Sequence, residues 1–215
     1  MARPMTPPPH FDSAFRQSLQ NLFEWRRDVR HFRSDPVPDA VLAKLLNNAA
    51  LAPSVGLSQP WRFVRIDDNG RRAAVRDDFR RCNTEALAAQ SSDRGTVYAR
   101  LKLAGLEQAP CHLAVFADSD PVQGGGLGRA TMPETAAWSA VMAVHTLWLS
   151  ARAAGLGVGW ISILDPLAMV RILDVPAQWT FIGYFCIGFP QTLDQTPELE
   201  REGWETRQPP IVLQR

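Results

Sequence analysis

Three arginines and one aspartate stand within five consecutive residues, Arg26-Arg27-Asp28-Val29-Arg30. A guanidinium group presents paired N–H donors that match the oxygens of a phosphate, so this segment predicts an anchor for a phosphorylated ligand. The carboxylate of Asp28 would repel such an anion and needs a role of its own, either ion pairing with its neighbours or proton transfer. Taken alone, the segment fits a charged, solvent-exposed helix face better than a binding site, and the rest of the chain changes that balance.

A second candidate binding element is the loop from Ala52 to Trp61. Its two prolines and its glycine restrict the backbone, while Ser54, Ser58 and Gln59 offer hydroxyl and amide groups. Conformationally restricted loops with small polar side chains are typical of binding sites. Read alone, an ordinary turn explains the segment equally well.

Glycines recur at alternate positions in Gly155-Leu156-Gly157-Val158-Gly159-Trp160, but they do not form a dinucleotide fingerprint. That fingerprint runs from a strand through glycines into a helix, whereas here a predicted helix precedes the glycines and a predicted strand contains them. We interpret Gly157 and Gly159 as positions where the backbone closely approaches a flat ligand. Ser162 follows on the same predicted strand. It lacks a G-x-S-x-G context, which disfavours a serine hydrolase, and a core hydroxyl is the alternative to a site residue.

Composition argues against several classes of function. The net charge of +1 gives no basis for broad nucleic-acid binding. Three cysteines without a C-x-x-C pair favour free thiols in a reducing cytoplasm, and four histidines without metal-binding spacing make a metal site improbable. No uncharged apolar stretch is long enough to be a membrane span, and the proline-rich residues 1–9 lack the apolar core of a signal peptide.

Hydrophobic periodicity and helix-breaking residues predict helices and strands in alternation. The expected helices cover residues 11–25, 38–51, 71–90, 97–108, 135–154 and 167–173. The expected strands cover residues 61–66, 112–117, 157–163 and 179–188. The chain length predicts one domain over residues 17–215 with a C-terminal extension, after a poorly ordered arm over residues 1–16. The fold class is α+β or α/β with a central sheet.

The expected helix over residues 135–154 is apolar on nearly every side. Thr131 and Glu134 have the spacing of a capping box before it, and Gly155 suits its end. A helix of this composition should be buried all round, either at the centre of the fold or in an oligomer interface.

Taken together, these segments resemble the nitroreductase-like flavoprotein family over about residues 17–207. The arginine segment and the Gln59-Pro60-Trp61 loop are shared with ordinary members of that family. Asp28, the Thr131–Glu134 segment and the Gly159–Ser162 strand are similar to a branch that consumes FMN instead of recycling it. Further segments that carry the resemblance are Ala52–Gly56, Leu101–Gly105, Gly126–Arg129, Gly155–Ser162, Pro197–Glu200 and Gly203-Trp204.

The resemblance implies a central, mostly antiparallel mixed sheet flanked by helices, in an intertwined homodimer that binds FMN at the subunit interface. The arginine segment would hold the phosphate and the ribityl chain, and Arg207 would add a phosphate contact. Residues 118–129 would form a lid, and Gly157–Gly159 would lie against the flavin ring. The implied FMN-binding residues are Arg26, Arg27, Asp28, Val29, Arg30, Ser54, Gly56, Leu103, Gly157, Val158, Gly159 and Arg207.

The activity implied by this branch is an oxygen-dependent fragmentation of reduced FMN, which is then the substrate. The products would be 5,6-dimethylbenzimidazole, the lower ligand of vitamin B12, and erythrose 4-phosphate. Asp28 and Ser162 match two residues that are essential in the branch. Fragmentation needs proton transfers beside the ring, and a carboxylate among arginines should stay ionised and act as a base. No nicotinamide site is recognisable, so we expect a separate flavin reductase to supply the reduced FMN.

Two alternatives stay open. An NAD(P)H-dependent nitroreductase or flavin reductase would keep its FMN, but ordinary members carry a small neutral residue where this chain has Asp28. A non-catalytic flavin-binding protein would need the arginines and glycines, but neither Asp28 nor Ser162.

Overall fold

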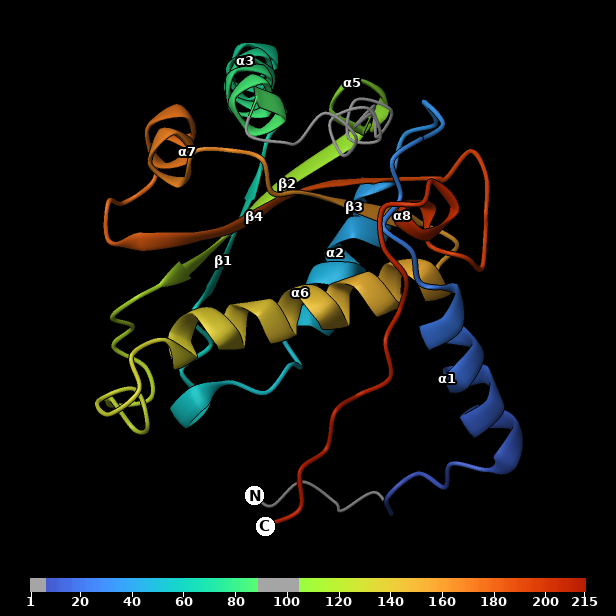
Figure 1. Cartoon of the computed structure of the whole chain (residues 1–215). Helices are drawn as coiled ribbons and strands as arrows, with labels where there is room; N and C mark the ends of the chain where they lie inside the picture. The colour runs from blue at the N-terminus through green and yellow to red at the C-terminus, as the bar shows by residue number, and fades with distance from the viewer. Residues whose placement is uncertain (1–6, 89–104) are drawn as a thin grey trace.

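The computed structural model describes residues 7–88 and 105–215, and its centre is a four-stranded antiparallel sheet in the order β1-β2-β4-β3 (Figure 1). A single parallel bridge joins Asp28 to Val158 beside this sheet. The expected α+β arrangement with a mostly antiparallel sheet is therefore confirmed. The strands are β1 (Trp61–Arg65), β2 (Cys111–Asp118), β3 (Gly157–Ile161) and β4 (Trp179–Gly188).

Helices cover both faces of the sheet. In Figure 1, α6 and α2 lie on one face, and α3, α5 and α7 lie on the other. Strand β2 accordingly places Leu113 and Val115 in the core under α6, and Ala114 and Phe116 in the core under α3 and α7. A strand that is buried on both faces has no polar positions to alternate, which explains its continuous apolar run. The helices are α1 (Ser13–Trp25), α2 (Asp39–Ala49), the 3-10 turn η1 (Val55–Leu57), α3 (Asn69–Ala88), α5 (Gly105–Gln108), α6 (Thr135–Ala153), α7 (Pro166–Leu173) and α8 (Glu198–Arg201).

The element boundaries mostly follow the sequence pattern, and two of the differences concern the predicted site. Strand β3 ends at Ile161, so Ser162 lies beyond the strand and not on it. Most of the helix expected over residues 97–108 lies outside the described residues, and only its last four residues are seen, as α5.

The expected capping box before α6 is wrong. The Thr131 hydroxyl instead donates to the Gly128 carbonyl at 3.1 Å, because residues 128–134 already form turns of their own. The helix begins at Thr135, after Glu134 in a helical conformation without a side-chain cap. Its end is as expected: Gly155 adopts a φ of 78°, and the Leu156 N–H donates to the Ala151 carbonyl at 2.8 Å.

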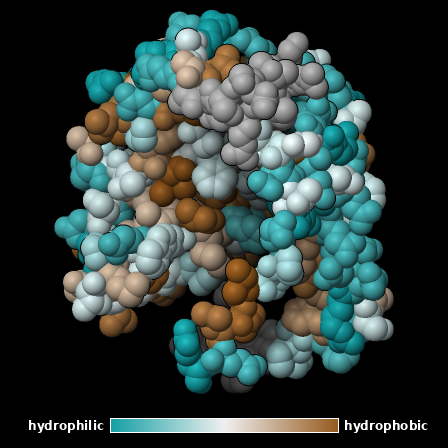
Figure 2. Space-filling model, viewed as in Figure 1, coloured by the Kyte–Doolittle hydropathy of each residue, from teal (hydrophilic) through white to brown (hydrophobic). Residues whose placement is uncertain are grey.

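Helix α6 is not buried on every side within one chain, which corrects the expectation from its composition. Trp138 is 53% exposed, and Val141 and Met142 are also exposed on the same helix. Helix α1 has no fully buried residue. The C-terminal tail, which runs past α6 and away from the body in Figure 1, exposes Ile211–Leu213. Figure 2 shows brown, hydrophobic residues on the segment that projects below the body. A single chain therefore leaves a large apolar surface uncovered.

None of the helices in the described ranges is long and apolar enough to cross a membrane.

One buried polar pair lies inside the core, between β2 and β4. His112 Nδ1 lies 2.8 Å from the Tyr184 hydroxyl, and Nε2 lies 3.1 Å from the Ala109 carbonyl oxygen. A carbonyl can only accept, so Nε2 carries the proton and Nδ1 accepts from Tyr184. Burial, and next the charge of Arg72, lowers the pKa of His112 to about 4. The imidazole is therefore held neutral in the folded state.

This pair predicts an acid-sensitive stability. A folded-state pKa below the ordinary value of 6.5 means that the unfolded chain binds more protons between those two values. The stabilisation is fully present above pH 6.5 and is lost as the pH falls through about 4. His112 should account for about 3 kcal/mol of the decrease in unfolding free energy over this range. In urea unfolding measured from pH 7 to pH 4, the unfolding free energy of His112→Gln should fall with pH by that much less than the wild type's. His10→Gln, in the exposed arm, should keep the wild-type pH dependence. A wild-type pH dependence of the unfolding free energy in His112→Gln would contradict this account.

Candidate functional site

The arginine segment is extended backbone and not a helix face. Helix α1 ends at Trp25, and Arg26 has φ −71° and ψ 121°. The segment then runs beside β3, where the Val29 N–H donates to the Val158 carbonyl at 3.0 Å. From α6, the indole N–H of Trp148 donates to the Arg27 carbonyl at 3.0 Å. Tertiary hydrogen bonds thus fix the backbone, which rules out the solvated-helix alternative.

The glycines of β3 make room for this segment. A Cβ atom at Gly159 would lie 2.1 Å from the Val29 carbonyl oxygen, and one at Gly157 would lie 2.6 Å from a Val29 methyl carbon. These glycines therefore permit a close approach of the arginine segment of the same chain, which the sequence did not lead us to expect. That Gly157, Val158 and Gly159 also line a flavin site stays a prediction.

Asp28 is half-buried, and both of its carboxylate oxygens have partners. Oδ1 accepts a hydrogen bond from the backbone N–H of Trp160 at 2.8 Å, and Oδ2 lies 3.5 Å from Arg30 Nε. Burial raises the pKa of Asp28, and the Trp160 N–H and Arg30 only partly oppose it. Burial thus outweighs the neighbouring arginine in setting the direction of this pKa shift, and the expectation that Asp28 stays ionised and acts as a base stays a prediction. A carboxyl group with a raised pKa is a better proton acceptor once it is ionised.

The three arginines of the segment have different surroundings. Arg27 is held by backbone carbonyls, donating from Nε to Asp194 at 3.2 Å, from Nη1 to Arg26 at 2.6 Å and from Nη2 to Glu24. The Arg30 side chain is 10% exposed, and its Nε and Nη1 have no hydrogen-bond acceptor among the described residues. Arg26 lies over the Trp148 ring, 5.1 Å from its centroid.

Arg26 and Arg207 form a positive pair beside the segment. Together with Arg30 they line a small cavity of about 110 Å³. Burial, and next the charge of Arg207, lowers the pKa of Arg26 and also that of Arg27. Cations that disfavour one another in this way are stabilised by an anion placed between them.

Ser54 and Gly56 lie elsewhere. The Ser54 hydroxyl accepts from the Gln59 N–H at 3.1 Å, and the Val55 N–H donates to the Ser139 hydroxyl near the start of α6. The arginine segment instead contacts Trp148, nine residues further along the helix, or about 14 Å at 1.5 Å per residue. Figure 1 places η1 and the end of α1 toward opposite ends of α6. Within one chain, the two halves of the predicted site do not meet.

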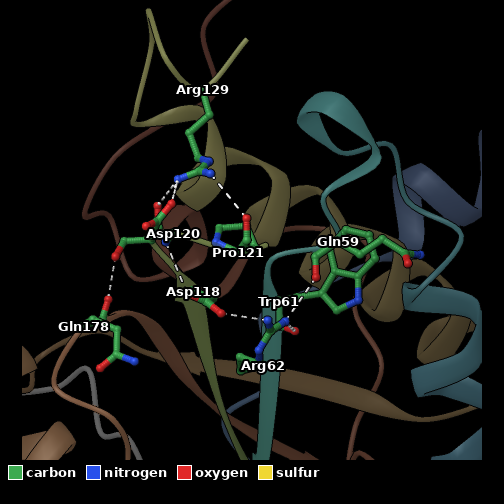
Figure 3. Close-up of polar contacts among 9 residues, drawn as sticks. Gln59, Trp61, Arg62, Asp118, Asp120, Pro121, Arg129 and Gln178 are labelled. Carbon is green, nitrogen blue, oxygen red and sulfur yellow. Dashed lines mark hydrogen bonds and ion pairs between the residues drawn. The ribbon is translucent and has the colours of Figure 1, made fainter. Parts of the chain in front are cut away.

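The glycine-rich loop over residues 118–129 packs against the Ser54 loop. A Cβ atom at Gly56, whose φ is 55°, would lie 2.9 Å from the Leu127 carbonyl oxygen. Figure 3 shows how the loop is fastened: Arg129 donates to the carbonyls of Ser119 and Pro121 and pairs with Asp120. At its base, Arg62 pairs with Asp118 at 2.8 Å (Figure 3). The loop is thus closed on itself, and its expected role as a lid stays a prediction.

The remaining predicted residues are placed as follows. Ser162 is exposed, and it follows by two residues Trp160, whose backbone N–H donates to Asp28. No hydrogen bond joins Ser162 to Asp28 in the described structure. Leu103 lies outside the described residues. Across residues 7–88 and 105–215, no group of three His, Cys, Asp or Glu side chains is arranged to hold a metal.

Sequence reasoning missed three contributors to this site. They are the Trp148 indole, the Trp160 backbone N–H, and Glu198, whose Oε2 lies 3.7 Å from Arg30 Nε. The only signal for Glu198 was its place in the Pro197–Glu200 segment, which carried the resemblance without a stated role.

Comparison with known proteins finds matches that cover most or nearly all of the chain. The Nitroreductase family model matches residues 23–189. A protein of Rhodospirillum rubrum named 5,6-dimethylbenzimidazole synthase is 59% identical over 207 residues, covering 96% of this chain and 98% of that protein. A protein of the same name from Rhodobacter capsulatus is 46% identical over 200 residues, covering 93% of this chain and 97% of that protein.

Among solved structures, the crystal structure of oxidized iodotyrosine deiodinase bound to FMN and 3-iodo-L-tyrosine has a TM-score of 0.73 with this chain. It is 22% identical and covers 91% of this chain and 97% of its own. At that identity the likeness shows a shared fold.

Proposed function

The chain belongs to the nitroreductase family, and we propose that it catalyses the oxygen-dependent fragmentation of reduced FMN to 5,6-dimethylbenzimidazole and erythrose 4-phosphate. The 59% identity to a protein named for this synthesis, over almost the full length of both chains, carries the proposal. The surroundings of Asp28 support it as well. Its carboxylate is oriented by the Trp160 N–H and by Arg30, and the distance to Arg30 is longer than in a hydrogen-bonded ion pair.

The residues present fit FMN. Arg30 has buried N–H groups without an acceptor, and neither the Arg26 nor the Arg207 guanidinium has a hydrogen-bond or ion-pair partner in the described part of the chain. We infer that Arg26 and Arg207 bind the phosphate and that Arg30 lies nearer the ribityl chain and ring. Arg27 acts by holding the backbone, because its donors are already taken by carbonyls.

Two side chains handle protons in this scheme. Reduced FMN, the substrate, supplies the ring that is broken and the electrons that reduce dioxygen. Asp28 accepts a proton on its carboxylate, and its raised pKa makes it a better base for this role. The exposed hydroxyl of Ser162 donates a hydrogen bond to the substrate from the end of β3. A separate flavin reductase supplies the reduced FMN.

We also infer a homodimer, because the two halves of the predicted site lie at opposite ends of α6 and do not meet within one chain. The exposed Trp138, Val141 and Met142 of α6 and the apolar tail would be covered by a second copy. A two-fold arrangement would place Ser54 and Gly56 of the partner subunit opposite the arginine segment. Each flavin would then be bound by both chains.

The proposed reaction is tested by mixing the protein with chemically reduced FMN in air, without NAD(P)H. Mass spectrometry should detect 5,6-dimethylbenzimidazole with the wild type and at least 100-fold less with Asp28→Asn or Ser162→Ala, as is typical for loss of a proton-transfer group. Asp35→Asn, a change of the same type in an exposed ion pair, should retain activity. Recovery of intact oxidised FMN alone, from folded protein that binds flavin, would overturn the proposal in favour of a reductase or a flavin carrier.

The phosphate assignment predicts a difference between two flavins. Arg26→Gln or Arg207→Gln should weaken FMN binding by about 10- to 100-fold, the usual effect of losing a charge-assisted hydrogen bond, and leave riboflavin binding nearly unchanged. Fluorescence titration with both flavins measures this, and Arg33→Gln, an exposed arginine paired with Asp35, is the matched control. Equal weakening for the two flavins would show that the arginines do not contact the phosphate.

The dimer predicts complementation between inactive variants. In coexpressed Asp28→Asn and Ser54→Tyr, heterodimers contain one site with both changes and one with neither, so the mixture should recover about a quarter of wild-type activity. Asp28→Asn with Ser162→Ala is the control and should recover nothing, since those residues lie in the same half of the site. Light scattering should give twice the chain mass. A monomer, or no recovery in purified heterodimers, would refute the shared site.

A further inference from the structure

Helix α8 brings a second carboxylate to the guanidinium that pairs with Asp28. Arg30 Nε lies 3.5 Å from Asp28 Oδ2 and 3.7 Å from Glu198 Oε2. The side chains of Arg30 and Glu198 are 10% and 22% exposed, so this contact is largely screened from bulk water. Two carboxylates therefore share one buried cation.

The position of Glu198 is set by the chain and not by chance contact of a flexible side chain. An antiparallel bridge between Phe32 and Pro190 holds the start of the C-terminal segment against the core. Further on, Arg27 Nε donates to the Asp194 carbonyl at 3.2 Å, and Pro197 then precedes α8 as its N-cap residue. Glu198 is the first residue of that helix, directly beside the arginine segment.

Neither carboxylate completes a short, hydrogen-bonded ion pair with Arg30. Its Nε and Nη1 are buried without a hydrogen-bond acceptor in the described chain, although both carboxylates lie within 4 Å of Nε. We propose that Glu198 is a positioning residue: by competing for Arg30, it prevents Asp28 from forming a full ion pair and leaves that carboxylate able to accept a proton. The inference rests on the proposed function, in which Asp28 is the base.

The charges around Asp28 give the sign of the effect. Burial does most to raise the pKa of Asp28, the Trp160 N–H and Arg30 lower it, and the negative charge of Glu198 raises it further. Removing that charge should therefore make Asp28 more acidic. The other titratable or charged groups around the pair are Arg26, Arg27, His31, Cys186, Asp194, Arg201, Glu202 and Arg207.

The test is a titration of Asp28 in ligand-free protein by NMR of ¹³C-carboxyl-labelled aspartate, with the signal assigned by its loss in Asp28→Asn. Glu198→Gln should lower the Asp28 midpoint by about one pH unit, a shift expected for loss of a nearby charge. Glu198→Asp, which keeps the charge on a shorter side chain, should restore most of the wild-type midpoint. Glu200→Gln is the matched control on the same helix, since Glu200 faces Arg27, and it should leave the midpoint within about 0.2 units.

The same variants are then assayed for product formation against pH. The acidic limb of the Glu198→Gln profile should move to lower pH by the amount seen in the titration. An unmoved midpoint in folded Glu198→Gln, or an equal shift in Glu200→Gln, would overturn the positioning role. If the midpoint moves but the wild type makes no benzimidazole, the positioning role stands as a property of the site while the proposed reaction fails.

Discussion

The docking of five residues onto one short strand is the interaction on which the site depends. Two hydrogen bonds hold the arginine segment, one from the Val29 N–H to β3 and one from the Trp148 indole to the Arg27 carbonyl. Neither bond would form if β3 carried side chains at Gly157 and Gly159, because Val29 occupies that space. The charges of Arg26, Asp28 and Arg30 are all oriented from this backbone, so their placement depends on hydrogen bonds to main-chain groups of the segment.

The C-terminal segment completes the arrangement from the other side. Arg201 pairs with Asp194 at 3.1 Å, and the Asp194 carbonyl in turn accepts from Arg27. These contacts place α8 so that the site has two electrostatic regions. Among the described residues, Arg26 and Arg207 form no ion pair within 4 Å, while Arg30 has two carboxylates beside it. The first region favours an anion, and the carboxylates of the second favour a proton acceptor.

Much of this could be predicted from the sequence because it depends on local patterns. The strand over Trp179–Gly188 was predicted with its observed bounds, and an aspartate inside an arginine run marked Asp28 as unusual. What failed depends on neighbours far apart in the chain. Burial raises the pKa of Asp28 against the opposing N–H of Trp160, which is 132 residues away, and the glycines of β3 leave space that Val29 occupies. Composition likewise showed that α6 is apolar all round, but not which of its faces one chain would leave exposed.

Helix α6 fixes the distance and the angle between the two halves of the site. Ser139 binds the loop that carries Ser54, and Trp148 binds the arginine segment, nine residues later. Nine residues make two and a half turns, about 900° at 100° per residue, so the two contacts point to opposite sides of the helix axis. One residue inserted between them would turn one contact by about 100° relative to the other and move it by about 1.5 Å. The length of this stretch is therefore constrained as strictly as the identity of the residues at its ends.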